Sequence, residues 1–299
     1  MERQDGSALS ARLKLISSMF IFGTIGIFVR YISMPSSIIA LVRGFVGVAF
    51  LALVTLIKRT EISKNNIKKN LKLLIPSGMA IGINWILLFE AYNYTTVATA
   101  TLCYYFAPIF VIIASPLVIR EKLTAKKIIC VLTALLGMIF VSGVAENGIP
   151  QISEMKGILF GVGAALLYAS VILMNQKISG ISAYEKTIMQ LLFASLVLLP
   201  YTLLTEDFSA LSLKPLTVGL LIFVGIVHTG IAYSLYFSSM NSIGAQSVAL
   251  MSYIDPIVAI ILSAVLLKED ITVWGVLGAV LVLGSTLISE LNIFERKKS

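Results

Sequence analysis

The sequence predicts an all-α integral membrane protein with ten transmembrane helices in two inverted five-helix repeats. Three observations predict this class: the composition, ten apolar runs of spanning length, and a sequence repeat whose flanking charges are reversed. Of the 299 residues, 58% are hydrophobic and only 13% are charged, and the mean hydropathy is +0.96. Soluble proteins contain about 45–50% apolar and about 25% charged residues, so this composition argues against a water-soluble enzyme.

The ten apolar runs cover most of the chain and leave only short loops and two small tails. A helix that crosses the hydrocarbon core needs about 20 mostly apolar residues. No small-residue cleavage site follows the first run, so we expect a retained helix and not a signal peptide. The runs are residues 11–32, 36–57, 71–92, 95–118, 126–145, 155–177, 184–204, 215–238, 245–267 and 271–290.

Loop charges predict the orientation of these spans, because cytoplasmic loops carry an excess of Lys and Arg. Most of the 23 basic residues fall in the two tails and in segments 58–72, 120–127 and 177–186. The loops of the opposite side are poor in basic residues and richer in Asp and Glu. We therefore expect a multi-pass protein of the cytoplasmic membrane with both termini in the cytoplasm. This asymmetry explains the net charge of +8, so no nucleic-acid partner is expected.

An internal repeat relates the two halves. A shift of 148 residues aligns the third and fourth runs with the eighth and ninth. Five spans is an odd number, so the second copy enters the membrane the other way up, in agreement with the opposite charges of the loops after 118 and 267. We expect one repeat over 11–145 and its inverted copy over 154–291, with a site near the midplane. The polar and proline identities are Asn93/Asn241, Tyr105/Tyr253, Pro108/Pro256, Ser115/Ser263, Glu121/Glu269 and Thr124/Thr272.

The repeated segment carries a resemblance to a known family. Residues 94–124, YTTVATATLCYYFAPIFVIIASPLVIREKLT, resemble the helix-4 signature of the EamA-type family of the drug/metabolite transporter superfamily, and the pattern returns over 245–272. Arg43 resembles a basic position common in that family, whereas Glu90 departs from the small residue usual at its position. The resemblance implies a secondary transporter that moves amino acids, amines or related metabolites outward. It also implies a central cavity lined by spans 1, 3, 4, 6, 8 and 9.

Ionisable side chains inside a span are expensive to bury in lipid and are therefore functional candidates. Asp255 lies near the middle of the ninth run, where it could bind a substrate ammonium or carry a proton. The alternative is a structural aspartate that braces a kink at Pro256. His228, the only histidine, lies near the middle of the eighth run. It could exchange protons with Asp255 and contact substrate, or it could form an interhelical hydrogen bond.

Arg43 and Glu90 both lie in the outer third of the membrane in the predicted orientation. They could pair as an external gate, or Arg43 could receive a substrate carboxylate. A fixed ion pair that tethers two helices is the third interpretation.

Aromatic and amide side chains at mid-depth could line a cavity suited to an amine, through cation–π contact, or to an apolar side chain. Ordinary helix packing is the alternative, although interfacial belts place Tyr and Trp near helix ends and these residues lie deeper. Two prolines, Pro108 and Pro256, each remove a backbone donor and predict kinks in the fourth and ninth runs. The predicted cavity residues are Asn84, Trp85, Tyr104, Tyr105, Tyr168, Tyr233 and Tyr253.

The sequence contains no HExxH, no Gly-Lys-Ser/Thr nucleotide loop and no GxSxG motif. We therefore do not expect the protein to be an enzyme, and we expect it to bind neither a metal nor a cofactor. The sequence favours a gradient-driven exporter of amino acids or amine-bearing metabolites, by uniport or proton-coupled exchange. A polyspecific exporter of hydrophobic organic cations is the alternative, with Glu90 and Asp255 supplying the negative charge. The expected partners are a small-molecule substrate, membrane lipids and, in an exchanger, protons; the oligomeric state stays open.

Overall fold

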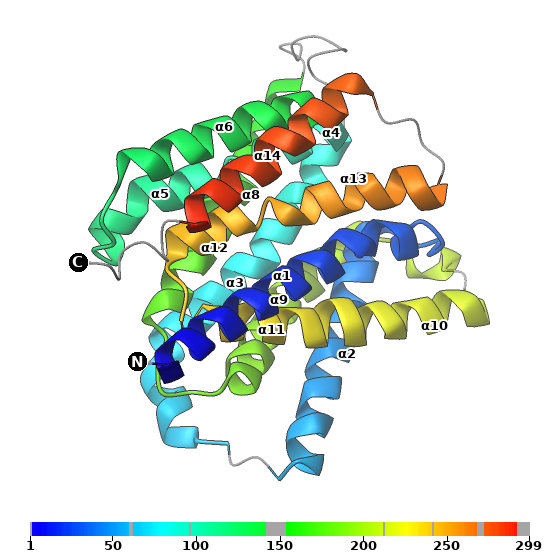
Figure 1. Ribbon diagram of the computed structural model, residues 1–299. Helices are drawn as coiled ribbons and strands as arrows, with labels where there is room; N and C mark the ends of the chain where they lie inside the picture. The colour runs from blue at the N-terminus through cyan, green and yellow to red at the C-terminus, as the bar shows by residue number, and fades with distance from the viewer. Residues whose placement is uncertain are drawn as a thin grey trace.

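The computed structural model describes residues 2–59, 62–95, 97–141, 154–211, 213–240, 242–267 and 272–291. Every regular element within these ranges is a helix, which confirms the predicted all-α class (Figure 1). Seven helical stretches in the described ranges are long and apolar enough to cross a membrane. The chain is therefore a multi-pass membrane protein.

Each of the ten predicted ranges coincides with one helix or with consecutive helical segments. The first half contains α1 (Glu2–Val29), α2 (Ser36–Ile57), α3 (Lys64–Tyr94), α4 (Val97–Tyr104), α5 (Ala107–Val118) and α6 (Ala125–Val141). The second half contains α8 (Met155–Lys177), α9 (Ala183–Thr205), the short η2 (Phe208–Ala210), α10 (Pro215–Phe223), η3 (Val224–Ile231), α11 (Ala232–Ser239), α12 (Ala245–Met251), α13 (Ile254–Leu267) and α14 (Val273–Leu291). Positions 142–145 of the fifth predicted span lie outside the described residues.

The third helix begins before its apolar run. The sequence predicts a start at 71, but α3 begins at Lys64 because the Ser63 hydroxyl caps it, accepting a hydrogen bond from the Asn66 backbone N–H at 3.4 Å. Capping supplies a partner for a backbone donor that the first turn leaves free, so polar residues can extend a helix beyond its apolar span.

The fourth and ninth spans are interrupted near their middle, at equivalent positions of the sequence repeat. Between α4 and α5 the Tyr105 N–H bonds the Leu102 carbonyl at 3.1 Å, and between α12 and α13 the Tyr253 N–H bonds the Leu250 carbonyl at 3.2 Å. Each interruption lies just before the proline that predicts it, Pro108 or Pro256. Irregular backbone inside a membrane is tolerated only where protein or a cavity surrounds it, so both breaks point to the interior of the bundle.

The uniform apolar run over 215–238 suggests a regular α-helix. The eighth span of the structure is different. Residues Val224–Ile231 form a π-helix between α10 and α11, and the Thr229 hydroxyl reaches back five residues to the Val224 carbonyl at 3.4 Å. π-helical turns are rare and frequently lie at functional sites.

The helices pack closely through small residues. α6 lies along α14, and α1 lies against both α13 and α11 (Figure 1). A Cβ at Gly23 of α1 would lie 2.6 Å from the Asp255 carbonyl oxygen, so only glycine permits this approach to α13. Two glycines of α8 permit close contacts in the same way, because α8 meets Thr95 at Gly157 and Cys103 at Gly161.

One end of the bundle is tightly packed. Its core consists of large apolar side chains from α1, α11 and α12, among them Leu15, Met19, Phe237, Met240 and Val248, all buried. The first residues of α1 and the last residues of α14 both lie at this end (Figure 1). We refer to it as the basic end, because Lys14 and the N-terminal turns of α3 also lie there.

Candidate functional site

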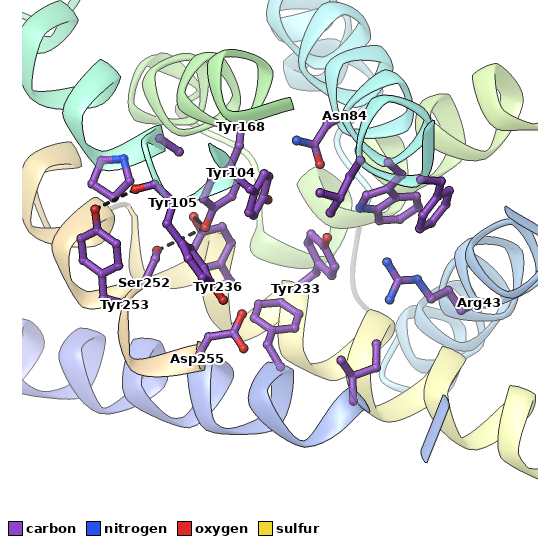
Figure 2. Close-up of a pocket in the computed structure, with 17 residues that line it drawn as sticks. Arg43, Asn84, Tyr104, Tyr105, Tyr168, Tyr233, Tyr236, Ser252, Tyr253 and Asp255 are labelled. Atoms are coloured by element: carbon purple, nitrogen blue, oxygen red, sulfur yellow. Dashed lines mark hydrogen bonds between the residues drawn. The ribbon is translucent and has the colours of Figure 1, made fainter. Parts of the chain in front are cut away.

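A cavity of about 250 Å³ lies at the two helix breaks, within the bundle. Its wall comes from α1, α2, α3, α8 and α11 and from both interrupted spans (Figure 2). These are the six spans expected from the sequence together with α2. The lining residues are Phe22, Ile25, Arg43, Asn84, Trp85, Leu88, Phe89, Tyr104, Tyr105, Ala107, Pro108, Tyr168, Tyr233, Tyr236, Ser252, Tyr253 and Asp255.

Asp255 contributes the acidic group of this wall. It lies in the first turn of α13, directly after the break, and lines the cavity (Figure 2). Among the described residues, no hydrogen-bond donor or basic side chain engages this carboxylate. The close approach of Gly23 fixes the backbone at the same point from the other side. The aspartate is therefore rigidly placed at its backbone and unpaired at its carboxylate.

Arg43 contributes the basic group and approaches from the opposite side of Tyr233 (Figure 2). Its guanidinium lies 4.5 Å from the centroid of the Trp85 ring, which is a cation–π contact. Its Nε is buried and has no hydrogen-bond partner. Buried polar groups in native proteins are nearly always hydrogen-bonded, so this unpartnered donor beside a cavity is unusual.

Tyrosines form the rest of the wall and are linked to one another. The Tyr168 hydroxyl lies 2.7 Å from that of Tyr236 and 3.2 Å from that of Ser252, and the Tyr104 ring stacks on Tyr168 at 5.5 Å between centroids. The hydroxyl groups of Tyr168, Tyr236 and Ser252 thus form one hydrogen-bonded group in the cavity wall.

A further hydrogen bond joins the two helix breaks directly. The Tyr253 hydroxyl donates to the Tyr105 carbonyl at 2.8 Å, as the dashed line in Figure 2 marks. The Asn84 amide, on α3, donates to the Ala164 carbonyl at 2.6 Å and is held at the cavity wall.

The structure does not bring Arg43 and Glu90 together as an ion pair, so that expectation is corrected. Glu90 accepts a hydrogen bond from the Tyr201 hydroxyl at 2.6 Å and a longer one, at 3.5 Å, from Asn93. It does not line the cavity. Tyr201 of α9 supplies the hydrogen-bond partner of the glutamate, and the guanidinium of the arginine lies over the Trp85 ring.

His228 also lies outside the cavity wall. Its Nε2 lies 2.8 Å from the Thr24 hydroxyl of α1, and its ring packs against Phe28 and Phe223. Because the Thr24 hydroxyl itself donates to the Ile21 carbonyl at 2.7 Å, Nε2 carries the proton and donates to Thr24. The structure thus contains the interhelical hydrogen bond, one of the two alternatives, and His228 is not among the residues that line this cavity.

Sequence reasoning missed several residues of the wall, among them Phe22, Tyr236 and Ser252. Tyr236 lies one turn beyond Tyr233 on the same helix face, so the three-residue spacing could have indicated it. No signal in the sequence marks Ser252 or Phe22, because their place in the wall depends on how α1 and α12 pack.

Comparison with known proteins identifies the family of this chain. A model of the EamA-like transporter family matches residues 9–143 and again residues 155–291. The chain is 29% identical over 278 residues to the uncharacterized transporter YxxF of Bacillus subtilis (strain 168), covering 91% of this chain and 87% of that protein. It is 22% identical over 231 residues to protein PecM of Dickeya dadantii (strain 3937), covering 76% of each.

A solved crystal structure has the same fold. It superposes with a TM-score of 0.84 over 97% of this chain and 99% of the other, at 15% sequence identity. The family match spans both halves and confirms the resemblance found in the repeated segment. The chain therefore belongs to the EamA-like transporter family, and the protein is a membrane transporter.

Proposed function

We propose that this transporter exports amino acids or amine-bearing metabolites by alternating access, either as a uniporter or in exchange for protons. One observation carries the proposal: a single cavity offers the guanidinium of Arg43 on one side and the carboxylate of Asp255 on the other. A zwitterion has the complementary pair of charges. The aromatic wall between them suits the apolar part of such a molecule.

The two charged groups are available for a ligand. Leaving a buried donor unsatisfied costs about 1–3 kcal/mol, and the buried Nε of Arg43 is in that position. A substrate carboxylate bonded to the guanidinium would recover this cost. Asp255 has no partner among the described residues, so its carboxylate can accept a substrate ammonium or a proton.

Size and charge argue against the alternative, a polyspecific exporter of hydrophobic cations. Pockets for drug-sized ligands measure about 300–1,000 Å³. The cavity here measures about 250 Å³, which suits a small metabolite. A cationic substrate would also meet the positive charge of Arg43, and Glu90, which was to supply a second negative charge, lies outside the wall and is bonded to Tyr201.

The proposal includes an architecture of ten spans in two inverted repeats, over 11–145 and 154–291. Two separate matches to one family model support it. The helix contacts support it as well: α3 packs on α8 as α11 packs on α1, and α4 and α5 pack on α8 as α13 packs on α1. Under such a repeat α6 and α14 are each other's counterparts, and they pack together.

We further propose that both termini face the cytoplasm and that the structure is an outward-facing state. The charge asymmetry of the loops supports the orientation. The packed core at the basic end supports the state, because large buried side chains fill that end of the bundle. In alternating access the opposite end would close when this core separates.

Transport assays in proteoliposomes test the substrate class. Counterflow with a panel of amino acids and their decarboxylated amines should identify a substrate, and the Arg43→Ala variant should then lose amino acids while sparing the amines. Loss of a hydrogen bond to a charged group costs about 1.5–3 kcal/mol, so we expect affinity for the amino acid to fall by at least about tenfold. Arg43→Lys is the matched control, since it keeps the charge. Equal losses for acids and amines would contradict a carboxylate-reading role.

The role of Asp255 is tested separately. If it couples transport to protons, Asp255→Asn should abolish uptake driven by a pH gradient and retain counterflow at equal pH. If the protein is a uniporter that uses Asp255 for the ammonium, the variant should weaken binding of amines at every pH. Transport by the variant that equals wild-type transport in both assays would show that Asp255 neither binds the substrate nor couples transport to protons.

A further inference from the structure

A second and larger cavity, of about 530 Å³, lies between α1, α2, α9 and α11 at the basic end. It shares no lining residue with the cavity of Arg43 and Asp255. We call it the lysine groove, defined by Lys14 and Lys58 at its outer end and by Phe50, Leu51 and Leu235 at its inner end. Nothing in the proposed transport cycle uses it.

We propose that the lysine groove binds an anionic phospholipid, with the phosphate of the headgroup between the two amines and an acyl chain along the apolar inner wall. In the orientation proposed above this lipid belongs to the cytoplasmic leaflet. Basic pockets between transmembrane helices on the cytoplasmic side are a recognised form of site for anionic headgroups.

The outer end carries two positive charges that have no counter-ion among the described residues. The Lys14 amine lies 3.4 Å from the Ser238 hydroxyl, and the Lys58 amine lies 3.4 Å from the Tyr184 hydroxyl and 5.5 Å from the centroid of the Tyr184 ring. Among the described residues neither amine has a carboxylate within 4.0 Å. Lys127, by contrast, is paired with Glu121 at 2.8 Å. Two exposed amines that face only neutral groups attract an anion.

The acidic residue next to this end does not neutralise it. Glu185 follows Tyr184, but its carboxylate accepts hydrogen bonds from the backbone N–H groups of Ser63 and Ser182, each at 2.7 Å. It is part of the capping box of α9 and is buried. Its charge is thus directed at two backbone donors, and the lysines keep a net positive potential at the groove.

The inner end is an apolar channel of suitable length. Phe50, Leu51 and Val54 lie along α2 above Lys58, and Ile231 and Leu235 face them from the neighbouring helix. From Lys58 to Phe50 the helix rises about 12 Å at about 1.5 Å per residue. One leaflet supplies half of a hydrocarbon core of about 30 Å, so the channel accompanies an acyl chain through most of its leaflet.

A buried hydroxyl lies between the two ends. Ser234 lines the groove one turn deeper than Ser238, is 8% exposed, and its Oγ has no hydrogen-bond partner. Phospholipids carry ester carbonyls below the phosphate, at the boundary with the acyl chains. The serine hydroxyl can donate to such a carbonyl, which gives this unpartnered group a partner.

Thermal unfolding of the purified full-length protein in mixed micelles tests the proposal. Added phosphatidylglycerol should raise the Tm of the wild type above the value in the same amount of phosphatidylcholine. The Lys14→Gln/Lys58→Gln protein should lose this difference. A matched control, Lys68→Gln/Lys72→Gln, removes the same charge from the same end of the bundle but outside the groove, and it should keep the difference.

Two further arms separate the possible sources of the effect. Leu235→Trp fills the apolar channel and leaves both lysines, so it should also abolish the shift. Inorganic phosphate and glycerol phosphate, which have no acyl chain, should produce no shift at the concentrations used for lipid.

Three outcomes would overturn the proposal. An equal loss in the Lys68/Lys72 control would reveal general surface electrostatics. A full shift with free phosphate, or an unchanged shift in Leu235→Trp, would reveal an anion site without a lipid chain. The assay requires no transport substrate, so its result is independent of the proposed function.

Discussion

The contact between Gly23 and the backbone at Asp255 gives the sharpest test of the packing around the site. A Cβ at Gly23 would lie 2.6 Å from the Asp255 carbonyl oxygen and 2.7 Å from the Val258 Cβ. Ordinary van der Waals contact begins near 3.4 Å, so Gly23→Ala forces α1 and α13 apart by several tenths of an ångström. One of the two clashing groups is a backbone carbonyl, which cannot rotate away as a flexible side chain can.

The chain supplies its own control three residues further along α1. A Cβ at Gly26 would meet nothing within 4 Å. Alanine in place of a helical glycine stabilises by about 0.5–1 kcal/mol, and this gain applies to both positions. Overpacking costs about 1–3 kcal/mol, and this cost applies only to Gly23→Ala. The free energies of unfolding of the two variants should therefore differ by about 1–3 kcal/mol, with Gly26→Ala the more stable.

Reversible unfolding in mixed micelles measures this difference, and a substrate-binding assay adds a second readout. Because the displaced backbone carries Asp255, Gly23→Ala should also weaken binding of an amine-bearing substrate, whereas Gly26→Ala should leave it unchanged. Equal stability of the two variants would show that α1 and α13 separate at no cost. The contact could then not hold Asp255 in place.

Three smaller predictions concern single hydrogen bonds. Tyr201→Phe deprives the Glu90 carboxylate of its donor and should lower the free energy of unfolding by about 1.5–3 kcal/mol, measured by chemical denaturation; no loss would show that the bond is not formed in solution. Thr24→Val leaves the Nε2 proton of His228 unpartnered and should cost about 1–3 kcal/mol in the same assay, and an unchanged stability would contradict a hydrogen bond between α1 and His228. Tyr253→Phe removes the bond between the two helix breaks and should cost about 0.5–1.5 kcal/mol, with increased hydrogen exchange at both breaks; exchange at one break alone would refute their coupling.

The positions of the helices along the chain were largely predictable from the sequence. Spanning length and apolar composition are strong constraints, and each predicted range contains helix in the structure. The breaks near Pro108 and Pro256 were also predictable, because a proline lacks a backbone donor. The π-helix over 224–231 was not, since the apolar residues of that span are compatible with a regular helix and only the tertiary packing selects the wider turn.

The site was predictable in its residue types but not in its pairings. Depth along a helix follows from counting residues, so the sequence predicts a similar level for Arg43 and Glu90, and this depth stays a prediction. The direction in which a side chain points around its helix depends on the neighbouring helices. In the structure Glu90 therefore accepts a hydrogen bond from Tyr201 and is not paired with Arg43. The lysine groove was not predictable from the sequence either, because its walls come from separate helices of both halves of the chain.

The hydrogen bond between the helix breaks also shows how two copies of one motif have come to differ. In the proposed repeat Tyr105 and Tyr253 are equivalent residues, yet only Tyr253 donates its hydroxyl, and it donates to the carbonyl of its counterpart. The hydroxyl of Tyr105 has no partner among the described residues, and Tyr105 lines the cavity. A pair of identical subunits would have to use both tyrosines alike. In a single chain the two can differ. Tyr253 connects the two helix breaks, and the Tyr105 hydroxyl stays available in the cavity, so the two sides of the site are not alike.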